Sequence, residues 1–461
     1  MKFHLLPALA ATMVSLAGAA AAQTGVTGSG APIENRQPSL VLTQLVATAG
    51  AFPCRECDGA TAINTLGMIH TFAGNFSAFD MPKAQGQLVS IGSNTALFSI
   101  LENRYGGNGK STFALPDLTG RAAVGAGAGT PYALGEQAGS ATNVMTLAQL
   151  PSHDHGLPGG GVTGPAGGAA AIDNVQPSLG LNYQIAVRGA LGGTGVDPFV
   201  GQVSLFGGGF DPGGFMQAAG QVLSIADYGQ LFGVIGAKFG GDGLTTFALP
   251  DLRGRIAVGV GNGVTLGEAF GDDSLVLTEG NLPLHDHTLP GGGLTDPTGG
   301  NAPFDNAQAS LGLNYLISLQ GLFPPRDSGG GASPDSPYYG EVVAFAGTVA
   351  PNGWAFANGQ LLTIASNTAL FSILGSVYGG DGKSTFALPD LRGRTIIGSG
   401  VGFNVGDLLG ERSTTLTVAQ LAPHAHDLPM GGVPEPATWS LLIGGFGLAG
   451  TALRRRRRLA A

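Results

Sequence analysis

The chain carries the heptapeptide Thr112-Phe113-Ala114-Leu115-Pro116-Asp117-Leu118 and repeats it unchanged at residues 246–252 and 385–391. Successive copies are about 135 residues apart, which is too long for one unit of a solenoid and suits a small domain. Each copy leads into a Gly-Arg pair and then into an apolar, glycine-rich strand. The sequence therefore predicts three tandem copies of one folded unit.

The residues before each heptapeptide predict the secondary structure of the unit. In the third copy, residues 359–374 read GQLLTIASNTALFSIL. Ser366 or Asn367 can cap a short helix with its leucines and phenylalanine on one face. Gly-Gly-Asp-Gly at residues 379–382 then ends the helix and turns the chain. Each unit thus reads strand, strand, short helix, turn, extended segment and strand, an α+β fold rich in β-structure.

A His-x-His triplet closes each of the three units. Residues two apart on an extended strand point to the same face, so each triplet can present two imidazoles together. Imidazole suits zinc, iron, nickel or copper, and six convergent rings would saturate one such ion. The middle residue changes from aspartate to alanine in the third triplet while both histidines persist, which favours a role for the histidines. The candidate metal ligands are His153, His155, His285, His287, His424 and His426.

Two other interpretations of the triplets stay open. The histidines can be solvated turn residues that duplication copied, or they can belong to a secreted metal-dependent hydrolase. A catalytic zinc site usually holds three protein ligands and a water, and Glu136, Glu268 and Glu411 recur upstream of the triplets. However, the triplets share no adjacent carboxylate, and the sequence has no Gly-x-Ser-x-Gly elbow. We therefore expect no catalytic residue and no enzyme, with the hydrolase as the alternative.

The first residues predict export. A basic start, a short apolar stretch and an Ala-Ala-Ala exit are typical of a secretory signal peptide over residues 1–22. Cleavage is expected between Ala22 and Gln23. The exported part then carries a net charge of about −15, which repels phosphate backbones and argues against nucleic acid as a partner.

The last residues predict a membrane anchor. Val433-Pro434-Glu435-Pro436 precedes an apolar run over residues 437–453, and five arginines follow at 454–458. The run is near the lower limit of about 17 residues for a membrane span, and its cationic end should stay cytoplasmic. A single hydrophobic transmembrane helix is therefore expected in this segment.

The glycine and cysteine contents predict further features of the chain. Glycine accounts for 81 of 461 residues without a collagen period, which indicates a turn-rich folded chain. Glycine and proline concentrate after the first two triplets, at residues 156–168 and 290–300, and predict flexible or loosely extended linkers there. Cys54 and Cys57 are the only cysteines, and in an exported protein a local disulfide is the expected state.

The heptapeptide with its Gly-Arg pair, the helix-forming stretch and glycine-rich turn before it, and the closing His-x-His together resemble the phage tail collar domain. This domain occurs in bacteriophage tail fibres and in bacterial relatives named microcystin-dependent proteins. The third copy matches best, while the first departs at Thr119, where the others have Arg253 and Arg392. The resemblance implies three collar-like repeats joined by Gly/Pro-rich linkers. Their expected bounds are residues 23–158 (core 66–122), 159–290 (core 199–256) and 291–432 (core 338–395).

The resemblance also implies a role for the triplets. In similar phage short tail fibres, three chains each supply a His-x-His to one metal ion on the threefold axis. If the triplets of this chain have the same role, the resemblance implies a divalent transition metal, zinc or iron, held by the six candidate ligands. Two assemblies fit: three repeats of one chain close a pseudo-trimer around one site, or three chains align as a homotrimer with three sites.

The C-terminal segment 433–461 resembles the PEP-CTERM sorting signal, with Pro434, Glu435 and Pro436 as its motif. The resemblance implies processing by an exosortase-type enzyme after transient anchoring in the inner membrane of a Gram-negative bacterium. Delivery would be to the cell surface or the extracellular matrix. The sequence therefore predicts an exported structural or adhesive protein that recognises a surface glycan or an exopolysaccharide.

Overall fold

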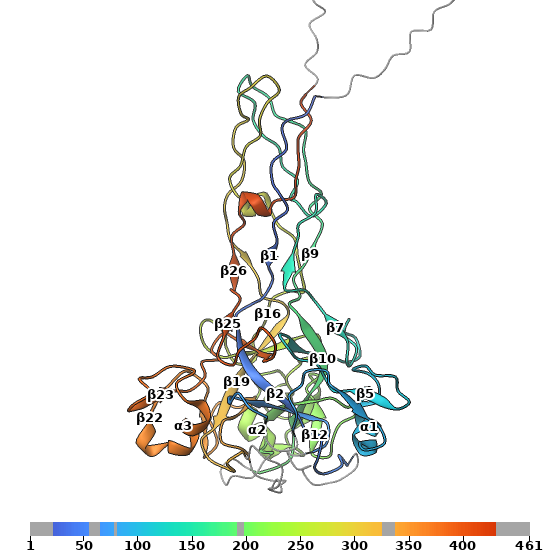
Figure 1. The fold of residues 1–461 in the computed structure, drawn as a ribbon, viewed down its shortest axis with the longest axis vertical. Helices are drawn as coiled ribbons and strands as arrows, with labels where there is room; N and C mark the ends of the chain where they lie inside the picture. Colours follow the sequence, from blue (N-terminus) through green and yellow to red (C-terminus); the bar gives the residue numbers. More distant parts are fainter. Residues whose placement is uncertain (1–21, 55–64, 78–80, 191–197, 325–336, 430–461) are drawn as a thin grey trace, which may run out of the picture.

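A computed structural model describes residues 22–54, 65–77, 81–190, 198–324 and 337–429. It shows a broad head from which a long, narrow stem rises (Figure 1). Nearly all of the predicted signal peptide and the whole predicted sorting segment 433–461 lie outside these residues. In the part that is described, no helix is both long enough and apolar enough to span a bilayer.

Each repeat contributes one long strand to the head, and these strands are buried along almost their whole length: β2 (Ser39–Val46), β10 (Ser178–Ala186) and β19 (Ser310–Ser318). Each long strand runs parallel to the glycine-ended strand that follows the heptapeptide of another repeat. The parallel pairs are β10 with β6 (Ala122–Gly125), β19 with β15 (Ile256–Gly259) and β2 with β24 (Thr395–Gly398). The first repeat thus pairs with the second, the second with the third, and the third with the first.

Three further strands close the centre of the head, namely β3 (Met68–Phe72), β11 (Gln202–Phe206) and β20 (Glu341–Phe345). Each is antiparallel to the long strand of its own repeat and also to both of its counterparts. The result is one 14-stranded sheet with contributions from all three repeats. The repeats therefore share one sheet and one core instead of forming separate tandem units, because each leaves strand edges that only its neighbours can pair.

The expected short helix is present in each repeat, and the helices of the first and third repeats lie at opposite sides of the head (Figure 1). Each helix lies in the connection between the two strands of a small antiparallel sheet: α1 (Thr95–Leu101) between β4 (Leu88–Ser90) and β5 (Thr112–Ala114), α2 (Gly229–Ile235) between β13 (Val222–Ser224) and β14 (Thr246–Ala248), and α3 (Thr368–Leu374) between β22 (Leu361–Thr363) and β23 (Thr385–Ala387). Asn367 is the N-cap residue of α3, but its side chain donates to the carbonyl of Thr363 and does not cap the helix.

Short edge strands complete the head: β7 (Gln137–Ala138), β12 (Phe215–Gln217), β16 (Ala269–Phe270), β21 (Trp354–Phe356) and β25 (Leu408–Leu409). The heptapeptide phenylalanines Phe113, Phe247 and Phe386 are fully buried in the shared core. The prediction of a β-rich fold with three helices is confirmed. Cys54 is disulfide-bonded, and Cys57 is the only other cysteine of the chain.

A ring of buried glutamines ties the repeats together where the stem meets the head. The backbone N–H of Gln37 donates to the side-chain oxygen of Gln176, that of Gln176 to Gln308, and that of Gln308 back to Gln37. The donor–acceptor distances are 3.2, 3.0 and 3.0 Å. This cyclic order shows a pseudo-threefold axis within one chain.

The stem is built from three two-stranded sheets: β1 (Ile33–Glu34) with β8 (Thr142–Asn143), β9 (Ile172–Asp173) with β17 (Ser274–Leu275), and β18 (Phe304–Asp305) with β26 (Ser413–Thr414). Two 3₁₀ turns, η1 (Glu279–Asn281) and η3 (Val418–Gln420), also lie in the stem, and a third, η2 (Ile364–Ser366), precedes α3. The stem has its own apolar core: Ile33, Met145, Leu150, Ile172, Leu277, Leu282, Phe304, Leu416 and Leu421.

The segments expected to be flexible or loosely extended linkers are ordered, extended arms of this stem, so the prediction of flexibility was wrong. Residues 156–168 fold back as a hairpin in which Gly156 bridges Val162 and His153 bridges Ala166. Residues 290–300 do the same in the second repeat. Gly160 and Gly161 have φ of 89° and 87°, so glycine serves the turn here. The high glycine content reflects tight turns and close packing, not disorder.

Candidate metal centre

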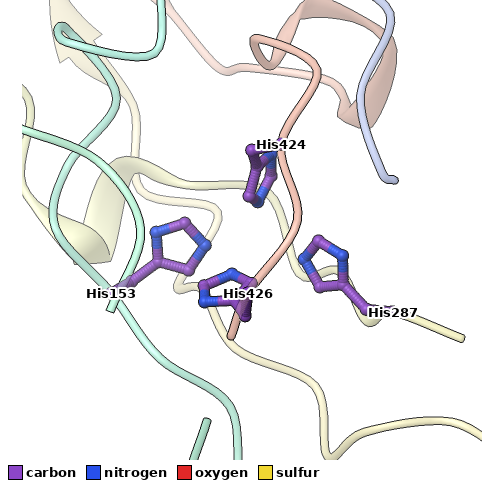
Figure 2. Close-up of side chains that lie close together, drawn as sticks. All are labelled: His153, His287, His424 and His426. Atoms are coloured by element: carbon purple, nitrogen blue, oxygen red, sulfur yellow. The ribbon is translucent and has the colours of Figure 1, made fainter. Parts of the chain in front are cut away.

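The structure brings all six predicted ligands together inside the stem of a single chain. Their side chains are at most 5% exposed. Figure 2 shows His153, His287, His424 and His426 gathered between three chain segments, one from each repeat. Neighbouring ring centroids lie 4.7 to 5.5 Å apart. The cluster lies within one stem and therefore needs no second chain.

The extended backbone of each triplet turns both histidines inward, as the alternation of side chains requires. Between them, Asp154 is exposed, while Asp286 and Ala425 are partly exposed. An antiparallel segment holds each triplet in place. In the first repeat, His153 and Ala166 exchange backbone hydrogen bonds, and the N–H of His155 donates to Thr163 Oγ1 at 3.0 Å.

Every Nδ1 atom of the cluster is anchored to a backbone carbonyl. The first histidine of each triplet donates to the carbonyl two residues earlier, at 2.9 Å in all three repeats. The second histidine donates across to another repeat: His155 to Asp296 O, His287 to Gly25 O and His426 to Gly164 O, at 2.8 to 2.9 Å. A carbonyl oxygen only accepts, so each Nδ1 carries the hydrogen. The lone pair of each neutral ring is therefore on Nε2.

The Nε2 atoms face one another without donors. The Nε2 atoms of His153 and His285 are 3.1 Å apart, and neither carries a hydrogen when both rings are neutral. The Nε2 atoms of the other four histidines are buried and have no hydrogen-bond partner. In two overlapping groups of four, the ligand atoms lie within 4.8 Å of one another. This cluster could hold a metal ion, because a single cation satisfies several convergent lone pairs at once.

Burial makes a proton a poor substitute for a metal. It lowers the pKa of His153 to about 3 and the pKa of His287 and His424 to about 4. Burial also lowers the pKa of His155 and His285, although hydrogen bonds to backbone carbonyls partly oppose this. At neutral pH these rings are neutral, which is the state in which imidazole binds a metal.

Carboxylates are not part of this arrangement. Within the described ranges, the candidate metal-binding groups consist of histidines alone. Glu136 and Glu268 accept hydrogen bonds from backbone N–H groups three residues earlier, as turn residues do. The glutamates considered as catalytic bases therefore stabilise local turns in the first two repeats.

Sequence reasoning missed the residues that orient the ligands. Thr163, Thr295 and Thr24 each accept a hydrogen bond from the backbone N–H of the second histidine of a triplet. A signal was present, because a threonine lies eight residues after His155 and eight after His287. The third threonine was hidden because it precedes its histidine by 402 positions.

Comparisons with known families agree with this architecture. The Phage Tail Collar Domain matches residues 67–123, 201–257 and 340–396. The PEP-CTERM protein-sorting motif matches residues 432–458. No curated protein and no solved structure shows a match to the chain. The chain therefore contains three phage tail collar domains followed by a PEP-CTERM protein-sorting motif.

Proposed function

We propose that this protein is an exported, non-enzymatic component of the cell surface whose stem is fastened by one metal ion. The sorting motif indicates export and cell-surface sorting in a Gram-negative bacterium, and collar domains are structural domains of fibres. Cleavage between Ala22 and Gln23, transient inner-membrane anchoring and exosortase-type processing at Pro434-Glu435-Pro436 belong to the same proposal.

The observation that carries the metal role is the set of facing Nε2 atoms. His153, His155, His285, His287, His424 and His426 would hold the ion, and their Nδ1 hydrogen bonds already fix the rings in the required tautomer. A bound zinc or iron ion would supply the positive charge that links the three repeats. Imidazole donors suit both metals.

The alternative, a metal-dependent hydrolase, is less well supported. A catalytic zinc ion keeps one position open for water and usually has three protein ligands. Six imidazoles around one ion would leave no such position. The deep burial of all six rings also separates the centre from any polymeric substrate. These features favour a fastening role over catalysis.

Adhesion is the finer part of the proposal. Each repeat adds a similar unit to the head, made of a helix and a small two-stranded sheet. Leu88, Val222 and Leu361 occupy the same place in the three small sheets and are 62 to 65% exposed. Repeated, similar surfaces suit a repetitive ligand, so an exopolysaccharide or a surface glycan fits this head better than a unique protein partner.

Native mass spectrometry of the exported chain, residues 23–432, tests the metal role. We expect a monomer that carries one zinc or iron ion and loses it after treatment with a chelator. A protein that stays metal-free in the presence of either metal would overturn the proposal. A trimer that dissociates into monomers when its ions are removed would replace the intramolecular site with an intermolecular one. The double variant His153→Ala, His285→Ala is the control and should retain no metal.

A further inference from the structure

The third repeat of the stem is completed by the first residues of the described chain. In the first two repeats, the arm beside each triplet follows it through a hairpin. In the third, residues 24–27 occupy that place. The N–H of Thr24 donates to His426 O and that of Thr27 to His424 O, both at 2.9 Å, and the N–H of His424 donates back to Thr27 O at 3.0 Å.

The contacts of this segment reproduce those of the hairpin arms atom for atom. Thr24 Oγ1 accepts from the N–H of His426 at 2.9 Å, while Thr163 and Thr295 accept from His155 and His287 at 3.0 Å. All three threonines are buried. The difference is covalent: the two hairpin arms are tethered directly to their triplets, whereas Thr24 is about 400 residues away from His426 in sequence.

The segment orients ligands from two repeats at once. Besides holding the backbone of His426, it provides Gly25 O as the acceptor for His287 Nδ1 at 2.8 Å. The N–H of Gly25 donates to Thr288 O at 2.7 Å, and Thr27 Oγ1 donates to Asp286 O at 2.8 Å. If the segment left the stem, the His287 ring would lose the partner that fixes its tautomer, and a buried N–H of His426 would lose its acceptor.

We propose that residues 23–30 are a docking arm whose binding completes the metal centre, so that stem closure and metal binding are coupled. This inference rests on the proposed metal role. The two hairpin arms are joined directly to their triplets and cannot move far from them. Residues 23–30 have no such short connection and can detach by local opening. Coupling is reciprocal, so a metal that binds better to the closed stem also holds the arm in place. With cleavage before Gln23, the arm would dock and the ion would be retained after export.

Metal affinity of arm variants in the exported chain tests this coupling. We compare the wild-type chain with a variant lacking residues 23–27 and with Thr24→Val, using competition with a chromogenic zinc chelator. Thr163→Val is the matched control, since it removes the same hydroxyl from a tethered arm. Loss of ligand orientation should weaken zinc binding by about 10- to 100-fold in the first two variants and by less in the control. A synthetic peptide of residues 23–27 should restore tight binding to the deletion variant.

Hydrogen exchange provides a second readout that does not depend on affinity. The N–H groups of Thr24 and Thr27 should exchange at least about tenfold more slowly with zinc than with chelator, because the ion holds the arm closed. Fluorescence of Trp354, which is buried in the head, reports whether each variant is folded. Two results would overturn the proposed coupling without affecting the proposed metal role. One is equal zinc affinity in the deletion variant and the wild type, and the other is hydrogen-exchange rates that do not change when zinc is added. A wild-type chain that binds no metal would instead overturn the proposed function.

Discussion

Removing the metal should lower the thermal midpoint of the protein by about 5 °C or more. Four Nε2 atoms of the cluster are buried without a partner. An unsatisfied buried polar atom costs about 1–3 kcal/mol, so the ion contributes at least about 4 kcal/mol by satisfying them. Unfolding entropy is about 2.1 cal/mol/K per residue, or roughly 0.8 kcal/mol/K for about 400 residues. The ratio of these two values gives the expected shift of about 5 °C.

Differential scanning calorimetry of the exported chain measures this shift. The chain is first stripped with a chelator and then scanned with and without zinc in excess of the dissociation constant. The free zinc concentration is set at about 1,000 times that constant, where mass action stabilises the bound form by about 4.1 kcal/mol. His70→Gln is the matched control, because His70 is a buried histidine of the head outside the cluster.

The His70→Gln control should lower the thermal midpoint of the zinc-bound and the zinc-free protein equally and leave the zinc-induced shift unchanged. The double variant His155→Gln, His287→Gln should abolish the zinc-induced shift. A shift below about 1 °C in a wild-type chain that demonstrably binds zinc would refute the reasoning, since the lone pairs would then cost far less than burial implies. An undiminished shift in the double variant would refute it as well.

Three further perturbations have defined outcomes. Burial lowers the pKa of three cluster histidines to about 3–4, from about 6.5 in an unfolded chain, so acid protonates the unfolded metal-free chain first. The stability that the neutral buried histidines contribute should therefore be complete above pH 6.5. Between pH 6.5 and pH 4, the free energy of unfolding should fall by up to about 1.4 kcal/mol per pH unit for each histidine. A free energy of unfolding that does not change with pH in urea titrations would contradict this. Phe247→Ala should cost about 3–5 kcal/mol in urea unfolding because Phe247 is fully buried, whereas Leu88→Ala, at a site 65% exposed, should stay within about 0.5 kcal/mol. The His70 Nδ1 atom lies 2.9 Å from a Glu341 oxygen in the buried core, so His70→Leu alone should cost about 3–5 kcal/mol, and adding Glu341→Leu should recover most of it in a double-mutant cycle.

Local features of the fold were predictable because they depend on neighbours in sequence. The identical heptapeptides predicted three equivalent units, and Phe113 and its counterparts are buried in the same way in each. The stretch before each heptapeptide predicted a helix, and α3 buries Leu370 and Leu374 as expected. The period of two within each triplet predicted that both histidines would share a face, and all six are buried while Asp154 is exposed.

Closure of the repeats into a ring was not predictable from these local patterns. The parallel pairing of β2 with β24 joins residues more than 350 positions apart, and no sequence period specifies which repeat supplies the partner strand. Glycine misled the interpretation of residues 156–168, because the same residue serves flexible linkers and tight hairpins. Between the N-terminal arm and its hairpin counterparts, little more than a Thr-Gly or Thr-Asp pair is shared. Only the three-dimensional structure identifies the arm.

The antiparallel pairing at the stem tip has a mechanical consequence. The N–H of Leu428 donates to Ala22 O at 2.8 Å, so both ends of the described chain leave the molecule side by side, at the far end from the head. A pull between the head and residue 428 runs along the extended segment that contains His424 and His426. The hydrogen bonds between this segment and residues 24–27 are then loaded in shear and resist the pull together. The histidine cluster lies at the same level of the stem. A molecule held by this end would present its head outward and resist tension at the point where its three repeats are fastened.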